Sequence, residues 1–127
     1  ASGCSAKEKE DFTVETEMLP KEGNNTIRCV GYLVNKGDRD LQITHRSPLI
    51  QYEVYKGDKI VKIVPSVTFS KGYKHLLQQN ERYHPDEVTS IELQNGEYTI
   101  VAVASFSINE KEKKRYQIKS SPIHVAI

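Results

Sequence analysis

The stretch that decides the fold is Leu93-Gln-Asn-Gly-Glu-Tyr-Thr-Ile-Val-Ala-Val-Ala-Ser-Phe106, which opens with the tight-turn pair Asn95-Gly96. From Tyr98 onward the residues alternate with a period of two. One face carries Tyr98, Ile100, Ala102, Ala104 and Phe106, and the other carries Thr99, Val101, Val103, Ser105 and Ser107. Because apolar residues occupy both faces, this pattern predicts a strand that is covered on both sides, at the centre of a β-sandwich.

Similar alternation extends over most of the chain. Residues 12–18 have one apolar face, residues 26–35 have two, and a strand that begins at Leu41 is interrupted by Pro48. The clearest hairpin and the later strands are residues 49–55 with 59–64, residues 88–93, and a last strand from Tyr116 whose apolar phase slips at Ser120-Ser121-Pro122. Turns at regular spacing and no long helical pattern predict an all-β, antiparallel β-sandwich of seven to eight strands.

The region from Pro65 to Glu87 breaks this regularity, because its 23 residues show no sustained period of either kind. We expect it either to contain a short strand at residues 66–70 and a helical turn at residues 74–80, or to be a functional loop. Phe69, Tyr73 and Tyr83 lie in this region. These aromatic residues either cover one open end of the sandwich or form a recognition surface for a partner.

Leu93-x-x-Gly96-x-Tyr98 resembles the tyrosine corner of immunoglobulin-like domains, in which a tyrosine that enters the penultimate strand bonds back to the backbone. This resemblance implies an immunoglobulin-like topology. Ile100 stands where the second cysteine of antibody domains would fall, so only the topology is carried over.

A narrower resemblance covers residues 26–106 and rests on Val34-Asn35, Tyr52-Glu-Val-Tyr-x-Gly57, Pro85-Asp-Glu87 and Gly96-x-Tyr98. These motifs are similar to those of the bacterial intracellular proteinase-inhibitor domain first named from Bacillus. That family usually has Gly where this chain has Asp86, and it tends to carry Trp, which is absent here. The resemblance implies the sandwich fold and raises inhibition of a protease as an alternative function.

The first residues, Ala1-Ser2-Gly3-Cys4-Ser5, resemble the lipobox of bacterial lipoproteins, in which the cysteine is lipidated and becomes the mature N-terminus. The charged residues 7–11 that follow have the composition of a flexible tether. We therefore expect residues 1–11 to be a lipobox remnant and tether with its lipid on Cys4, and residues 12–127 to be a single domain. The alternatives are that Cys4 is a remnant of cloning or an ordinary free cysteine. The anchor would place the domain outside the cytoplasm, on the bacterial cell membrane.

The second cysteine, Cys29, lies in a strand-like run, where an unpaired cysteine usually acts as a small buried apolar residue. A Cys4–Cys29 disulfide is the alternative if the chain is exported without lipid, and no flanking motif supports a catalytic thiol.

Few residues in the sequence suggest catalysis or a cofactor. The four histidines lack typical metal-ligand spacing, although His75 and His84 share a region with Glu81, Asp86 and Glu87, which leaves a weak cation site as an alternative. No phosphate loop, nucleophile elbow or converging carboxylate pair is present, so we expect neither an enzyme nor a cofactor nor a metal. The net charge of +1 is too small for nucleic-acid binding.

The sequence therefore predicts a non-catalytic envelope lipoprotein that acts as a protein-interaction or assembly module. Its partner would be an unknown protein or a cell-wall component, and it would meet the membrane through Cys4. The five basic residues among residues 110–119 are either a solvated hairpin tip or a weak site for anionic lipid or cell-wall polymer. The alternative function is a protease inhibitor that uses residues 65–87 or an edge strand, for which residues 51–55 are a candidate.

Overall fold

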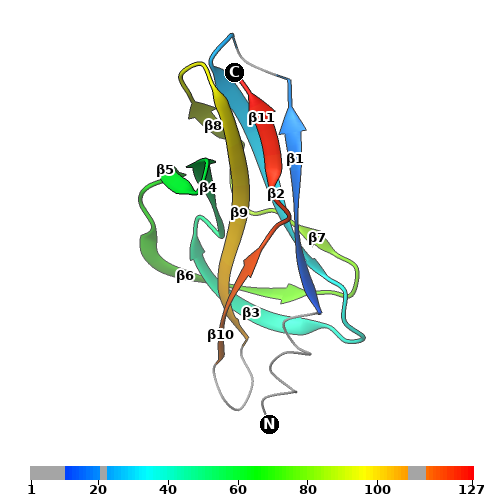
Figure 1. Ribbon diagram of the computed structural model, residues 1–127. Helices are drawn as coiled ribbons and strands as arrows, with labels where there is room; N and C mark the ends of the chain where they lie inside the picture. The colour runs from blue at the N-terminus through cyan, green and yellow to red at the C-terminus, as the bar shows by residue number, and fades with distance from the viewer. Residues whose placement is uncertain (1–10, 21–22, 109–113) are drawn as a thin grey trace.

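The structure, a computed structural model, describes residues 11–20, 23–108 and 114–127, and all regular structure in them is β-strand (Figure 1). The strands are β1 (Phe12–Leu19), β2 (Thr26–Asn35), β3 (Leu41–Ser47), β4 (Ile50–Lys56), β5 (Lys59–Val64), β6 (Phe69–Leu77), β7 (Arg82–Tyr83), β8 (Thr89–Glu92), β9 (Glu97–Ile108), β10 (Lys114–Lys119) and β11 (Ile123–Ala126). Sheet A contains β1, β2, β7 and β8, and sheet B contains the other seven. All the pairings are antiparallel, and the predicted β-sandwich is confirmed.

The eleven strands occupy only seven lines, where a line is one position across a sheet. Four of these lines each hold two consecutive strands that lie end to end. β7 and β8 both pair with β2, β10 and β11 both pair with β9, and β3 and β4 also both pair with β9. β5 and β6 continue in the same way beside β4 and β3. Sheet A therefore has three lines and sheet B has four. The predicted number of seven to eight strands describes the lines, and each of four lines is divided into two segments.

A proline lies in each of the four interruptions, at Pro48, Pro65, Pro85 and Pro122. Proline has no backbone N–H to donate to a strand ladder, so it ends regular pairing in the interior of a sheet. The predicted interruptions at Pro48 and around Ser120-Ser121-Pro122 are confirmed.

β9 is the central strand of sheet B, as the sequence predicts. It pairs with β4 on one side and with β10 and β11 on the other. Ile100, Ala102 and Ala104 are completely buried on its inner face. The Tyr98 hydroxyl donates a hydrogen bond of 2.9 Å to the carbonyl oxygen of Gln94, which confirms the expected tyrosine corner.

The two sheets approach each other closely at Gly31 in β2, the central strand of sheet A. A Cβ atom at this position would lie 2.8 Å from the Tyr52 hydroxyl oxygen and 2.9 Å from Cδ1 of Ile50. Both residues belong to β4 of sheet B, so the absence of a side chain at Gly31 lets the sheets pack closely. Cys29, next to it on the inner face, is free and buried, as expected.

One lateral edge of the sandwich is closed by aromatic packing. Phe12 at the start of β1 lies 4.9 Å from Phe106 and 6.2 Å from Tyr116, measured between ring centroids. Phe12 is only 4% exposed, and Phe106 and Tyr116 are also buried. The side chains of β1, β9 and β10 thus join the two sheets along this edge, which we call the closed edge.

The expectation for residues 65–87 is wrong in its details. The longest element of the region is β6, a nine-residue strand paired with β3, and no helical turn occurs at residues 74–80. β6 is exposed along most of its length, so its sequence lacks the alternation that burial of one face imposes. Its backbone ladder with β3 holds it in place.

Two predictions fall outside the described residues. Cys4 and the tether, apart from Asp11, lie in residues 1–10, and the basic hairpin tip lies largely in residues 109–113.

Candidate interaction surface

The edge of sheet B formed by β5, β6 and the connecting residues 65–68 carries most of the exposed apolar surface. We call it the open edge. Seven of the eight large apolar side chains exposed among the described residues lie on it, namely Ile60, Val61, Ile63, Val67, Phe69, Tyr73 and Leu76. The eighth, Val88, belongs to the segment between β7 and β8 on the facing sheet. One edge of this sandwich is therefore unusually apolar.

β5 has the reverse of the usual amphipathic arrangement. Its register places Ile60 and Ile63 opposite Tyr55 and Glu53, on the outer face of sheet B. Lys62 pairs with the buried Val54 and so points to the inner side. An inward-pointing charge on an edge strand is one device that prevents uncontrolled edge-to-edge pairing.

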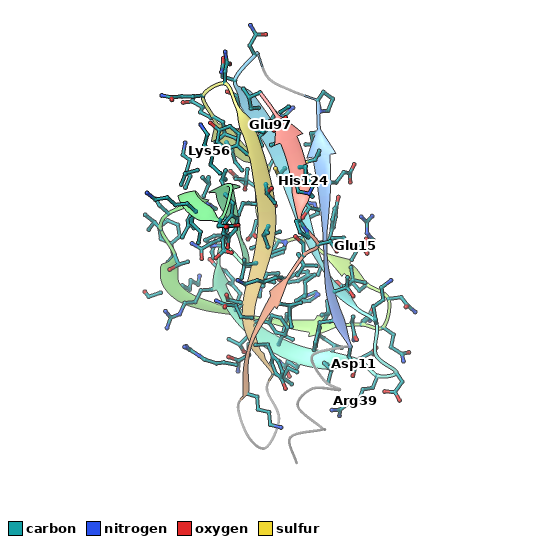
Figure 2. The ribbon with its side chains drawn as sticks, in the orientation of Figure 1. Asp11, Glu15, Arg39, Lys56, Glu97 and His124 are labelled. Atoms are coloured by element: carbon teal, nitrogen blue, oxygen red, sulfur yellow. The ribbon has the colours of Figure 1, made fainter. Side chains whose placement is uncertain are left out.

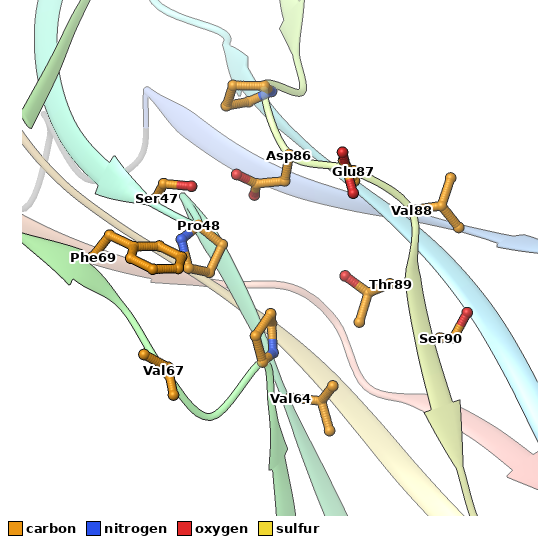
Figure 3. A pocket seen from close by; sticks show the side chains of 12 residues that line it. Ser47, Pro48, Val64, Val67, Phe69, Asp86, Glu87, Val88, Thr89 and Ser90 are labelled. Carbon is orange, nitrogen blue, oxygen red and sulfur yellow. The ribbon is translucent and has the colours of Figure 1, made fainter. Parts of the chain in front are cut away.

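A groove of about 590 Å³ separates the open edge from the facing rim of sheet A (Figure 3). Three of the four interrupting prolines meet here, together with Val67 and Phe69 on one wall and residues 85–90 on the other. Figure 3 shows the Phe69 ring beside Pro48, with Asp86 across from them. The groove lies beside the interruptions at these three prolines, near the ends of β3, β5 and β7.

Asp86 lines this groove and connects the two sheets. Its carboxylate oxygens accept hydrogen bonds from the backbone N–H groups of Leu49 (2.9 Å) and Ile50 (3.0 Å). Leu49 and Ile50 directly follow Pro48, at the start of β4. There the Asp86 carboxylate accepts the hydrogen bonds that a carbonyl group of a neighbouring strand would otherwise accept. Asp86 therefore has a structural role, which a glycine at this position could not fill.

The three aromatic residues predicted to bind a partner do not form one surface. Phe69 is 65% exposed and Tyr73 is 42% exposed, and both are on β6. Tyr83 is half-buried on β7 in sheet A, where its ring stacks on His75 with a centroid distance of 3.8 Å. Phe69 and Tyr73 are thus available to a partner, while Tyr83 packs between the sheets.

Tyr83 is held by polar contacts as well as by stacking. Its hydroxyl group lies 2.8 Å from Nε2 of the buried His45, whose Nδ1 lies 2.7 Å from the carbonyl oxygen of Arg46. His75 in turn contacts the Glu81 carboxylate at 2.8 Å. Burial raises the pKa of Tyr83, and the charges of Asp86 and Glu81 raise it further. This cluster joins sheet A to β3 and β6 at one end of the groove.

The described residues contain no group of three or more potential metal ligands. They also contain no helix that is long and apolar enough to cross a membrane. His75 and Glu81 pair with each other, and His84 Nδ1 lies 3.3 Å from the carbonyl oxygen of Asp86. Burial raises the pKa of the Cys29 thiol to about 11, which keeps it protonated near neutral pH.

The outer face of sheet A differs from the open edge because polar contacts cover it. Arg82 Nε lies 3.3 Å from the carboxylate of Glu15 on β1 (labelled in Figure 2), and its guanidinium carbon lies 4.1 Å from the Tyr32 ring centroid. Tyr32 also donates a hydrogen bond to Glu17. This face presents charges rather than apolar side chains.

Sequence reasoning missed several residues of the surface, including Lys62, Val67 and Asp86. It also proposed residues 51–55 as an edge strand, but β4 is interior, between β5 and β9. A usable signal existed: residues 59–80 contain four lysines and no acidic residue among many apolar ones. Comparison with protein-family models found no matching family, and comparison with curated proteins found no relative of this chain.

Proposed function

We propose that this chain is a non-catalytic protein-binding domain of the bacterial envelope and that the open edge is its binding surface. The observation that carries the proposal is that seven of the eight large apolar side chains exposed in the described part of the chain lie on that edge. Exposed apolar side chains that gather in one region of a folded protein are a typical mark of an interaction site. Large aromatic residues such as Phe69 and Tyr73 are also common anchors of protein interfaces.

The shape of the surface favours a protein over a small ligand. The exposed apolar residues spread along two consecutive strands, from Ile60 to Leu76, and do not converge on an enclosed cavity. Small ligands usually bind where a concave pocket covers most of their surface. An extended surface suits a partner that is itself extended or flat.

The proposal includes the anchor at Cys4, which would hold the domain at the membrane through a short tether. β1 begins at Phe12, at the opposite end of β1 from the turn into β2, so a tether would leave the domain near residue 11 (Figure 1). Metabolic labelling with a fatty-acid analogue tests this part. Labelling of the wild-type precursor that disappears in Cys4→Ala is expected, and an unlabelled wild type would contradict the anchor.

Site-specific photo-crosslinking in the native envelope tests the binding surface. A benzophenone amino acid at Val67 should crosslink to a partner protein, and the same group at the exposed Thr13 on β1 should not. Phe69→Ser should abolish the crosslink from position 67. Equal crosslinking from both positions, or a crosslink that survives Phe69→Ser, would remove the open edge from consideration.

Inhibition of a protease is a second candidate because the open edge includes a strand with one free side. Among the described strands β5 pairs with β4 alone, and an extended backbone with a free edge can pair with another chain. An inhibitor would slow a protease at a one-to-one ratio and resist cleavage within residues 59–77. Rapid cleavage there, with no loss of protease activity, would exclude this candidate.

A further inference from the structure

The two sheets of the sandwich differ by one line of strands, and this difference leaves part of the inner face of sheet B uncovered. β6 shows the effect along its length. Leu77 is completely buried, His75 is covered by Tyr83, Tyr73 is 42% exposed and Phe69 is 65% exposed. All four alternate on the same side of β6, the side that faces sheet A. Phe69 and Tyr73 thus belong to an inner face that no strand of the described residues covers.

The facing rim of sheet A has backbone groups available for an additional strand. The N–H of Leu93 donates to Asn25, next to β2, whereas the carbonyl oxygen of Glu92 points the other way and accepts a hydrogen bond of 2.9 Å from Lys62 Nζ. In an antiparallel strand, alternate residues direct both backbone groups to the same side. Ser90 and Glu92 therefore direct theirs away from β2, and no described strand pairs with β8 there.

The charges along the uncovered face have a distinct order. Val64, Val67 and Phe69 line the groove, and Lys62 on β5 and Lys71 on β6 are each two residues beyond this lining, one before Val64 and the other after Phe69. Lys71 is on the same side of β6 as Tyr73, because its ammonium lies 5.4 Å from the Tyr73 ring centroid. Glu87 lines the opposite wall beside the apolar centre. Acidic groups would thus be favoured at the two ends and disfavoured in the middle.

We propose that the groove binds an extended segment of a partner protein that pairs with the outer edge of β8 and completes sheet A. The segment would direct apolar side chains toward Phe69 and Val67, and an acidic side chain toward each of Lys62 and Lys71. It would supply the fourth line of sheet A. The inference rests on the proposed function. It defines the partner segment as a strand with apolar side chains in its middle and an acidic side chain toward each end.

Charge argues for such a partner over a second copy of this chain. Residues 59–80 carry four lysines and no acidic residue, so two open edges brought together would place like charges against each other. An acidic segment instead replaces the contact of Lys62 with the Glu92 carbonyl by an ion pair, and it frees that carbonyl for a backbone hydrogen bond.

Two synthetic peptides of about nine residues test the inference with the intact chain. In both, threonine alternates with four residues that share one face. That face reads Asp, Val, Val, Asp in the first peptide and Lys, Val, Val, Lys in the second. The first peptide should bind, measured by fluorescence anisotropy, and the second should bind at least about tenfold more weakly. Binding should slow hydrogen exchange of the Ser90 and Glu92 amides, because both gain carbonyl partners.

The variants locate the site. Lys62→Glu combined with Lys71→Glu should reverse the preference between the two peptides, and Phe69→Ser should weaken both. Lys36→Glu, just after β2, and Thr13→Ser, on β1, are controls at exposed positions away from the open edge and should leave peptide binding within about twofold. All five positions are exposed, so the variants should fold.

Each other outcome overturns the inference in a distinguishable way. Slowed exchange in β5 rather than at Ser90 and Glu92 would show that a strand adds to the other sheet. Self-association that Phe69→Ser abolishes would assign the groove to a second copy. If neither peptide binds but Val67 still crosslinks to a partner, the proposed function stands and the strand-like partner is wrong. If both the peptides and the crosslink fail, both proposals fail.

Discussion

At the two lateral edges of this sandwich the same kind of residue has opposite exposure. Phe12 on the closed edge is 4% exposed and packs against Phe106 and Tyr116. Phe69 on the open edge is 65% exposed. Both are at the first position of their strands and both face the opposite sheet. The difference comes from the sheets: their lines are aligned at the closed edge, so sheet B extends beyond sheet A at the open edge.

This comparison shows that the architecture, rather than the residue type, sets what an apolar residue contributes. Complete burial of a large apolar side chain stabilises a protein by about 1.5–3 kcal/mol relative to exposure. The closed edge gains this energy in folding. At the open edge the same energy is still available to a partner that covers Phe69 and Tyr73, which is the thermodynamic basis of the proposed function.

Phe12→Ala should have the largest effect on stability. Removal of a buried phenylalanine side chain from a packed cluster typically costs about 3–5 kcal/mol, and here it would open the contact of β1 with β9 and β10. Denaturant unfolding followed by far-ultraviolet circular dichroism measures the loss. A cost below about 1 kcal/mol would mean that the closed edge does not join the two sheets.

Asp86→Ala should have the next largest effect, because it leaves the buried backbone N–H groups of Leu49 and Ile50 without their acceptors. An unsatisfied buried donor costs about 1–3 kcal/mol. Asp86→Asn keeps one acceptor oxygen and should lose less. The exposed neighbour Glu87 is the control, and Glu87→Ala should change the unfolding free energy by less than about 0.5 kcal/mol. Equal effects at both positions would contradict the bridging role of Asp86.

Tyr83→Phe should cost about 0.5–1.5 kcal/mol through the lost hydrogen bond to His45, whereas Tyr73→Phe should cost almost nothing. Alkaline pH provides a second measurement. Because the folded protein raises the pKa of Tyr83, the folded state keeps this proton longer, and stability falls as pH rises above the ordinary tyrosine value of about 10. Tyr83→Phe should reduce that fall. An unchanged alkaline slope would mean that Tyr83 does not contribute to it.

The sequence predicted those parts of the fold in which burial imposes a pattern. β9 was recognisable because Tyr98, Ile100 and Phe106 are all buried on one face, which requires a period of two. β6 was not recognisable, since both of its faces are exposed over most of the strand and the ladder with β3 depends on no particular side chain. Pairing of this kind is a property of the assembled sheet.

The candidate site was predicted in part for the same reason. The sequence singled out Phe69 and Tyr73 because they are aromatic residues in a region that has no sustained period. Lys62 and Asp86 acquire their roles only from the register of distant strands: Lys62 reaches Glu92, and Asp86 reaches the start of β4. No local pattern in the sequence encodes those distances.

Phe69→Ala should have the smallest effect on stability and thereby sharpen the comparison with Phe12→Ala. The same side-chain atoms are removed, but at the open edge they are already largely in contact with water, so the unfolding free energy should change by less than about 0.5 kcal/mol. Phe69 lines the groove together with Pro48 (Figure 3), but its ring buries little surface that the substitution could remove. Parallel denaturant titrations of the two variants give the difference directly. A loss at Phe69 comparable to that at Phe12 would mean that Phe69 is covered in the free protein. The open edge would then be part of the core, and both proposals for it would lose their basis.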